Sequence, residues 1–309
     1  MKNSFLFLWL CLATCAMGKE KIYFVAHAGA GDPFWNIIYQ GARQAGLDEK
    51  VDVHFMAPET PNDLARQVEL LDAAIAAKPD AIALTVPNDL SLARSLRKAR
   101  DLKIPVVLVN SRPSPQALAK NPHLAFIGMD DYVAGQKVGE RAWASGKIQS
   151  RVLIANHQPG HAGLEHRRQG IQDYLSARGI TVAKLDIGDD AAAVTNVLQS
   201  YLNRNPDTSA VFCLGPACLH AIGRFFQKKQ RPIYLASFDL SPFTVQLIRE
   251  GGVAFTIDQD PYRQGYLGIS QLVALLRTHK FPQSVDTASS FVDKQNASEV
   301  FDLVKKGLR

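Results

Sequence analysis

The sequence has few cysteines and no concentrated charge. Four of its 309 residues are Cys, and two of these, Cys11 and Cys15, lie among the first 18 positions. The other pair, Cys213 and Cys218, is too small a set for a secreted fold held by disulfide bonds. We expect two buried free thiols, with an oxidised pair as the alternative. The formal net charge is +6, but Lys and Arg do not cluster, so the sequence argues against nucleic-acid binding.

Only the N-terminus carries a long apolar run. In residues 1–18 one positive charge precedes a mostly apolar stretch that ends in Ala16 and Gly18, the pattern of a signal peptide. The run is short for a membrane span, and an uncleaved anchor is the alternative. Another alternative is a lipid anchor, because Leu-Ala-Thr-Cys at 12–15 resembles a lipobox with Cys15 as the lipidated residue. We therefore expect a soluble protein exported to the periplasm.

Motifs for nucleotides, metals and common hydrolases are missing. The chain has no Walker A sequence, no Gly-x-Ser-x-Gly and no His-Glu-x-x-His. In the first glycine-rich loop Phe34 stands where a dinucleotide loop has its third glycine, and Asp32 would repel a pyrophosphate. A Pro-Gly pair interrupts the segment that carries His157, His161 and His166. We expect no cofactor and no metal site.

Two acidic pairs could serve as general acid and base. They are Asp130-Asp131 and Asp189-Asp190. Adjacent side chains point in different directions, so we expect both pairs to be solvated turn residues. Together with the missing hydrolase motifs, this predicts that the protein is not an enzyme.

Short apolar runs alternate with amphipathic stretches along the rest of the chain. We expect strands at 21–25, 51–55, 81–85, 104–109, 151–155, 181–185, 210–213, 233–237 and 253–257. We expect helices at 33–47, 90–101, 163–177, 191–203, 217–228, 242–249 and 262–278, and one more that begins with Thr60 as N-cap and Pro61 in its first turn. The alternation occurs twice, which predicts an α/β fold of two doubly wound parallel sheets.

Polar residues follow the apolar runs, where the expected strands end. Asn, Asp, Gln, Arg and aromatic residues dominate at 27–35, 110–112, 156–157, 238–239 and 258–259. Ligands of such sheets bind beyond the carboxyl ends of the strands. Planar polar groups can hydrogen-bond adjacent hydroxyls, and aromatic rings pack on the C–H face of a sugar. The pattern predicts a site for a small polyhydroxy ligand, either a monosaccharide or a cyclic polyol.

Six short segments follow one another in a characteristic order. They are Asp-Pro-Phe-Trp at 32–35, Ile-Pro-Val-Val-Leu-Val-Asn-Ser at 104–111, Ile-Gly-Met-Asp-Asp at 127–131, Arg-Arg-Gln-Gly at 167–170, Ser-Phe-Asp at 237–239 and Thr-Ile-Asp-Gln at 256–259. Together they resemble the periplasmic sugar-binding proteins of the ribose-binding type, the substrate-binding proteins of ABC importers. The resemblance implies the type I periplasmic binding protein fold, with two lobes joined by three crossings near 128–131, 257–260 and 283–286. The implied N-terminal lobe is 19–129 plus 260–284, and the C-terminal lobe is 130–259 plus 285–309.

The resemblance also implies the ligand contacts. Phe34 and Trp35 would sandwich a sugar ring. The implied hydroxyl contacts are Asp32, Asn110 and Gln259 from the first lobe and the hinge, and Arg167 and Asp239 from the second lobe. The weaker candidates are His27, Arg112, His157 and Asp189. Asn110-Ser111 replaces the Asp-Arg pair of that family, and Gly215-Pro216 replaces its Asn-Asp, so we expect a ligand other than ribose.

The expected function follows from this resemblance. A monomer would capture a small sugar or cyclic polyol and deliver it to the membrane permease of an ABC importer. The alternative is a sugar or autoinducer receptor that signals to a chemoreceptor or a sensor kinase. A repressor of the same fold would need an N-terminal helix-turn-helix, and the leader occupies that place.

Overall fold

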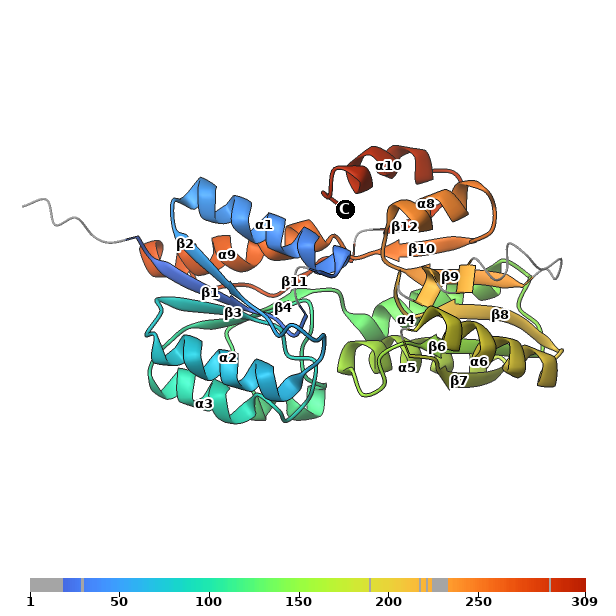
Figure 1. Cartoon of the computed structure of the whole chain (residues 1–309), viewed down its shortest axis with the longest axis horizontal. Coiled ribbons are helices and arrows are strands. Elements are labelled where there is room, and N and C mark those ends of the chain that lie inside the picture. The colour runs from blue at the N-terminus through green and yellow to red at the C-terminus, as the bar shows by residue number, and fades with distance from the viewer. Residues whose placement is uncertain are drawn as a thin grey trace, which may run out of the picture.

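The computed structural model describes residues 19–28, 31–188, 190–216, 218–220, 222–223, 233–288 and 290–309. The predicted signal peptide with Cys15, the candidate Asp189 and most of the predicted helix 217–228 lie outside these residues. Within the described ranges no helix combines the length and apolar character that crossing a membrane requires. The described residues form two lobes that lie side by side (Figure 1).

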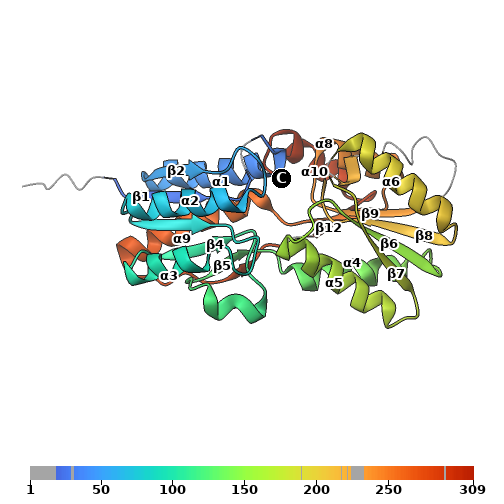
Figure 2. The same ribbon diagram turned by 60° about the horizontal axis from the view of Figure 1, so that its bottom comes forward.

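The first lobe is built on a parallel sheet with the strand order β11-β5-β4-β3-β1-β2. Its strands are β1 (Lys21–Val25), β2 (Asp52–Met56), β3 (Ala81–Leu84), β4 (Val106–Val109), β5 (Phe126–Gly128) and β11 (Val285–Asp286). α1 (Pro33–Glu49) and α9 (Pro261–Thr278) cover one face, and α2 (Leu64–Ala76) and α3 (Ala93–Asp101) cover the other (Figure 2). A 3-10 turn, η1 (Pro115–Lys120), precedes β5. β3 and β4 are buried along their whole length, as a sheet covered on both faces requires.

The second lobe repeats this plan with the strand order β12-β10-β9-β8-β6-β7. Its strands are β6 (Arg151–Asn156), β7 (Thr181–Asp186), β8 (Thr208–Cys213), β9 (Tyr234–Phe238), β10 (Phe255–Asp258) and β12 (Ser290–Asp293). α4 (Asp131–Ala144) and α5 (Ala162–Ser176) cover one face, and α6 (Ala191–Arg204), α8 (Pro242–Arg249) and α10 (Ala297–Lys305) cover the other. β12 pairs antiparallel with β10, whereas the other pairings are parallel. The sequence pattern predicts none of the strands β5, β11 and β12 and does not predict α10. β5 has three residues, and β11 and β12 are edge strands.

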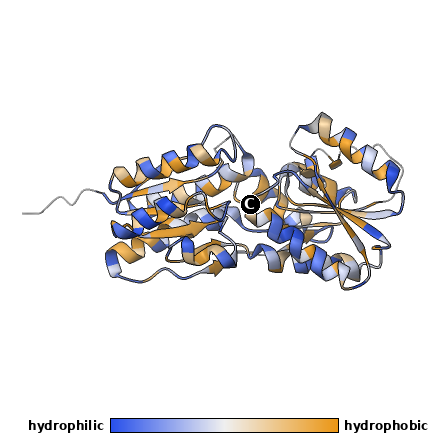
Figure 3. Ribbon diagram, turned by 90° about the horizontal axis from the view of Figure 1, so that it is seen from below, coloured by the Kyte–Doolittle hydropathy of each residue, from blue (hydrophilic) through white to orange (hydrophobic). Residues whose placement is uncertain are grey.

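The two-lobed α/β fold predicted from the sequence is confirmed. Apolar residues are concentrated along the strands, and polar and apolar residues alternate around the helices (Figure 3). Four buried apolar clusters, one on each face of each sheet, form the cores of the lobes. The alternation of buried runs and amphipathic stretches was therefore a sufficient signal for this architecture.

The predicted start of α2 is wrong. Asp63 is its N-cap, since the carboxylate accepts the main-chain N–H of Arg66 at 2.9 Å. Asn62, just before the cap, has a left-handed φ of 62°. A helix cannot continue through this conformation, so α2 begins after Asn62 rather than at Pro61.

In both lobes a pair of helices meets through glycine. On the contact between α1 and α9, a Cβ at Gly41 or Gly265 would lie 2.0 or 1.9 Å from a main-chain oxygen of the facing helix. On the contact between α4 and α5, a Cβ at Gly135 would lie 2.3 Å from the main-chain oxygen of Arg167. Only residues without a side chain allow these distances. The second contact brings Arg167 against the start of α4.

The chain passes between the two sheets three times. It does so between β5 and α4, between β10 and α9, and between β11 and β12. Val285 and Asp286 pair with Ile127 and Gly128 in the first sheet. The third passage therefore begins after Asp286, later in the chain than the predicted boundary at 284–285.

Candidate functional site

Arg167 lies at the centre of a buried polar network. Its Nε donates to Oδ1 of Asp131 at 2.7 Å, and its Nη1 donates to the main-chain oxygen of Leu214 at 2.9 Å. Nη1 also lies 3.4 Å from Oδ2 of Asp239. The guanidinium carbon is 4.7 Å from the ring centroid of Phe238. Contacts on every side hold this cation in one orientation.

Asn110 and Asp239 occupy matching positions in the two lobes. Each directly follows the fourth strand of its lobe, β4 or β9, and each has a left-handed φ, 64° for Asn110 and 68° for Asp239. Asn and Asp tolerate this conformation better than other residues with side chains. Such strained positions are concentrated at functional sites.

Gln259 joins these two residues across the second passage between the lobes. Its Nε2 donates to Oδ1 of Asp239 at 2.5 Å, and its Oε1 accepts a hydrogen bond from Nδ2 of Asn110 at 3.0 Å. A continuous chain of hydrogen bonds therefore runs from Asn110 through Gln259 and Asp239 to Arg167, and all four residues are at most 9% exposed. The structure thus brings together four of the residues that the sequence resemblance singled out.

The charges of this network are shifted by burial. Burial raises the pKa of Asp239 to about 6, although the Arg167 guanidinium beside it acts in the other direction. Burial also raises the pKa of Asp131. For Arg167, burial favours the neutral form, but the two carboxylates outweigh it and raise its pKa. The network offers both hydrogen-bond donors and acceptors, which matches hydroxyl groups because a hydroxyl does both.

The start of α1 supplies the aromatic candidates. Asp32 is the N-cap of this helix, and its Oδ1 accepts the main-chain N–H of Phe34 at 2.8 Å. The rings of Phe34 and Trp35 meet edge to face with their centroids 5.6 Å apart. Trp35 is buried, whereas Asp32 and Phe34 are half-buried. Burial raises the pKa of the Asp32 carboxyl, although hydrogen bonds from the following main chain act against this.

His27 lies beneath Trp35, with the ring centroids 4.6 Å apart. Its Nδ1 is 2.8 Å from Oγ1 of Thr85, and the same oxygen accepts the main-chain N–H of His27 at 2.9 Å. Oγ1 also accepts from Nε2 of Gln67 at 3.3 Å. Because both of its lone pairs are then engaged, its own proton is available to Nδ1, which leaves the ring proton on Nε2. Burial lowers the pKa of His27 to about 3, so the ring is neutral.

His161 faces His27 from the second lobe. The two ring centroids are 5.1 Å apart, and Nε2 of His161 is 3.4 Å from Oγ of Ser111. The main-chain N–H of Ala162 donates to the oxygen of Pro87 in the first lobe at 2.9 Å. The lobes are therefore in contact at the carboxyl ends of their strands, which is a closed arrangement. Burial lowers the pKa of His161 well below its ordinary value, and His27 and Arg167 act in the same direction.

The weaker candidates lie at the edge of this region. Arg112 forms an ion pair with Asp130 at 2.9 Å and lies 4.7 Å from the ring centroid of Phe126, so it is engaged outside the network. The ring of His157 packs against Gly215, where a Cβ would lie 2.8 Å from Cε1 of the histidine. Asp189 lies outside the described residues. In the described part of the chain, no group of three or more His, Cys, Asp or Glu side chains is placed to hold a metal ion.

Several residues of the network were missed or misjudged from the sequence. Asp131 was expected to be a solvated turn residue, and this is wrong, because it is buried and paired with Arg167. His161 was considered for a metal and lies instead at the contact between the lobes. Gln264, on α9, was not singled out, yet it contacts both Asn110 and Gln259. Asp131 and His161 stand at the starts of α4 and α5, and this position is the sequence signal that could have marked them as candidates.

Cys213 and Cys218 are both buried and free, as expected. Burial raises the pKa of Cys218 well above its ordinary value, and the neighbouring Cys213 adds to this. Leu214, which lies between them, supplies the main-chain oxygen that Arg167 contacts. The two thiols therefore pack behind the network as part of the core.

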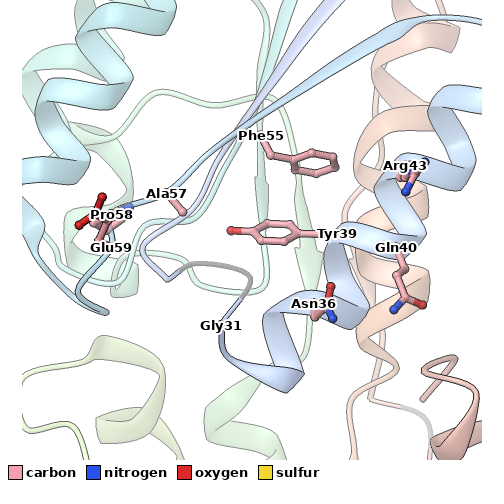
Figure 4. A pocket seen from close by; sticks show the side chains of 9 residues that line it. All are labelled: Gly31, Asn36, Tyr39, Gln40, Arg43, Phe55, Ala57, Pro58 and Glu59. Carbon is pink, nitrogen blue, oxygen red and sulfur yellow. The ribbon is translucent and has the colours of Figure 1, made fainter.

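A separate groove of about 620 Å³ lies on the first lobe beside α1 and β2 (Figure 4). Its floor includes the rings of Tyr39 and Phe55, whose centroids are 4.8 Å apart. The remaining lining residues are Gly31, Asn36, Gln40, Arg43, Ala57, Pro58 and Glu59. None of the predicted ligand contacts lines this groove, so it is distinct from the network between the lobes.

Comparisons with known proteins show which family and which sequences this chain resembles. The family model described as a periplasmic binding protein domain matches residues 22–280. A xylose/arabinose-binding protein from Sulfolobus acidocaldarius is 28% identical over 290 residues, which covers 89% of this chain and 71% of that protein.

Two solved structures extend the comparison. A crystal structure of an ABC sugar transporter (periplasmic sugar binding protein) from Legionella pneumophila is 38% identical with a TM-score of 0.83, and the match covers 88% of this chain and 100% of that chain. A carbohydrate transporter from Acidothermus cellulolyticus 11B, in complex with myo-inositol, is 27% identical with a TM-score of 0.86, and the match covers 94% of this chain and 100% of that chain.

Proposed function

This chain belongs to the periplasmic binding protein family, and from that premise we propose that it captures a small sugar or cyclic polyol between its lobes and delivers it to the permease of an ABC importer. One observation carries the proposal. Asn110, Gln259, Asp239 and Arg167 form a single hydrogen-bonded chain that spans both lobes. A ligand that joins this hydrogen-bonded network contacts both lobes at once, which is the condition for ligand-driven closure.

The ligand contacts that we propose are those implied by the resemblance. They are Asp32, Phe34, Trp35, Asn110, Arg167, Asp239 and Gln259, with His27, Arg112, His157 and Asp189 as weaker candidates. A ligand that cannot hydrogen-bond with buried amides and carboxylates leaves them without the partners they had in water, so hydroxyl-rich compounds are favoured over apolar ones. The myo-inositol complex and the xylose/arabinose-binding relative agree with this class of ligand.

The closed arrangement indicates how capture would work. In the open form Asp239 and Arg167 move away from Asn110 together with the second lobe. When the lobes close again, the direct contact between Gln259 and Asp239 re-forms, and ligand hydroxyls would add further hydrogen bonds to both lobes. The energy of closure comes from contacts that exist only when both lobes meet.

The setting of the protein belongs to the same proposal. Residues 1–18 would direct export to the periplasm, with lipidation of Cys15 as the alternative to cleavage. The protein would act as a monomer, hold no cofactor and catalyse no reaction. A loss of ligand uptake in cells that lack the protein supports import, whereas intact uptake with a lost transcriptional response supports the sensor alternative.

The test is isothermal titration of the purified protein against a panel of D-ribose, D-xylose, D-arabinose, D-tagatose and myo-inositol. We expect one or more of these to bind in the micromolar range or tighter. Asp239→Asn should weaken that binding at least about a hundredfold, because it breaks the charge pair with Arg167 in the buried network. Asp207→Asn is the matched control, since it breaks an ion pair with Arg151 near the far end of the second lobe. No binding across the panel, or equal affinities of the two variants, contradicts the proposal.

A further inference from the structure

Gln264 joins three separate segments beneath the network. It lies in the first turn of α9 and is fully buried. Its Nε2 donates to the main-chain oxygen of Gln259 and to Oγ1 of Thr287, each at 2.9 Å. Its Oε1 accepts a hydrogen bond from Nδ2 of Asn110 at 3.0 Å. One side chain therefore connects the end of β4 with the second and third passages between the lobes.

The orientation of the Gln264 amide is set by a main-chain oxygen, which can accept hydrogen bonds but cannot donate them. The main-chain oxygen of Gln259 can only accept, so the nitrogen of the Gln264 amide must face it. The oxygen of that amide then faces Asn110 and requires a donor there. Asn110 must turn its nitrogen inward, which leaves its Oδ1 directed to Ser111, whose hydroxyl donates to it at 2.9 Å.

The same orientation follows independently from the other end of the chain. Oδ1 of Asp239 accepts a hydrogen bond, so the amide of Gln259 must turn its nitrogen toward this oxygen. Oε1 of Gln259 then faces Asn110, and this again requires the nitrogen of Asn110. Both ends of the chain impose the same polarity on Asn110 and Gln259.

As a consequence, the side-chain amides of Asn110 and Gln259 can each offer a ligand only one kind of hydrogen-bonding group. Both N–H groups of Asn110 are engaged, one by Gln259 and one by Gln264, so only its oxygen retains a free lone pair. Oε1 of Gln259 accepts from Asn110 and lies 3.2 Å from Nε2 of Gln264, so the capacity left on Gln259 is its second N–H. Asn110 is an acceptor for a ligand, and Gln259 is a donor.

We propose that Gln264 is a positioning residue that fixes the polarity of Asn110 and Gln259, and that the site thereby selects a ligand whose hydroxyl donates to Asn110 while accepting from Gln259. This inference rests on the proposed function for its ligand class. A hydroxyl meets both requirements in one group, whereas a fluorine, an ether or a carbonyl meets only the second. The geometry of that hydroxyl then decides between epimers.

The binding test uses two pairs of epimers, D-arabinose with D-ribose and myo-inositol with scyllo-inositol. Gln264→Leu should weaken the better ligand of a pair about tenfold and reduce the affinity ratio within that pair by a similar factor. Gln271→Leu is the matched control, because this residue of the same helix accepts a hydrogen bond from the main chain of Gln283 and touches none of the network. An unchanged affinity ratio in Gln264→Leu overturns the proposal.

A second variant separates positioning from a general loss of structure. In Gln264→Glu the ionised carboxylate would oppose the main-chain oxygen of Gln259, whereas the protonated acid restores the donor. Burial raises the pKa of such a carboxyl, so the affinity of this variant relative to the native protein should recover on acidification from about pH 8 to about pH 5. A constant ratio over that range contradicts the proposal, even if Gln264→Leu fails to fold.

Side-chain amide NMR tests the polarity without a ligand. In protein labelled with ¹⁵N at Asn and Gln, the N–H groups of Asn110 and Gln264 should exchange slowly with water. The Asn110 signals should lose this protection in Gln264→Leu, which removes the acceptor of one Asn110 N–H group, and keep it in Gln271→Leu. If none of the four probes binds, the proposed function fails for these ligands while the NMR result still decides the role of Gln264. Fast exchange of Asn110 in the native protein refutes that role.

Discussion

His27 should make the closed form sensitive to acid. Burial lowers the pKa of this ring from 6.5 to about 3. For a base whose pKa is depressed in the folded state, the stabilisation is present above the ordinary pKa and is lost as the pH falls below it. Each pH unit below 6.5 costs about 1.4 kcal/mol until the folded pKa is reached. At about pH 5 the closed form has lost about 2 kcal/mol of stability. The equilibrium constant between it and a form in which His27 is hydrated then changes about thirtyfold in favour of the hydrated form.

Other titratable groups near His27 also contribute to the pH dependence, and their contributions must be distinguished from that of His27. His161, from the second lobe, has a lowered pKa and acts with the same sign. Asp239 acts with the opposite sign, since its raised pKa of about 6 means that the closed form gains stability as this group takes up a proton. A comparison with His27→Asn isolates the ring, because Asn keeps an oxygen for the Thr85 hydroxyl and does not titrate.

Tryptophan fluorescence is a direct assay for this prediction. Trp35 lies 4.6 Å from His27 and reports its hydration, and Trp143→Phe removes the signal of the exposed Trp143. In this background we expect an acid transition in fluorescence between about pH 6.5 and pH 4. His27→Asn should move its midpoint to lower pH, because the variant avoids the cost of about 2 kcal/mol that protonation of His27 imposes on the closed form at about pH 5. Urea unfolding at about pH 7 and pH 5 shows whether the transition is opening or unfolding. Superimposable acid profiles for the two proteins would refute the reasoning.

Three further predictions concern the buried contacts. Arg167→Met leaves Asp131 and Asp239 without their cation and should lower the free energy of unfolding by about 3–5 kcal/mol in urea titrations, and a loss below about 1 kcal/mol would contradict the buried pairing. Gly265→Ala places a Cβ 1.9 Å from the oxygen of Ile38 and should destabilise the protein by about 1–3 kcal/mol, whereas Gly31→Ala, with nothing within 4 Å, should be nearly neutral by the same measurement. Cys213 and Cys218 should resist a thiol reagent in the native protein and react after unfolding, and rapid native labelling would show that they are not core residues.

The fold could be read from the sequence because its signal is local. Runs such as 81–84 and 106–109 are apolar throughout, and the helices between them repeat apolar residues at helical spacing. Asn110, Asp239 and Gln259 could be placed at a site for a related reason, since each stands at the carboxyl end of a strand or just beyond it. These assignments needed no knowledge of which helices touch.

The rest of the site depends on tertiary contacts that leave no local mark. Asp131 looks like one of two acids in a turn, and only the close approach of α4 and α5 at Gly135 puts it beside Arg167. Gln264 looks like a polar residue of an amphipathic helix, but it contacts Asn110, which is 154 positions earlier in the chain. The start of α2 was misplaced because the left-handed turn at Asn62 also has no counterpart in the helix-start pattern.

The contact between α1 and α9 has a consequence for the order in which the protein can fold. It joins Gly41 to the helix that carries Gly265, so the apolar core on that face of the first lobe is incomplete until residues near the end of the chain have been synthesised. A nascent chain that ends before α9 leaves the surface of α1 exposed to water and to other chains. Such long-range contacts slow folding, and this face of the first lobe should become complete only after α9 has been synthesised.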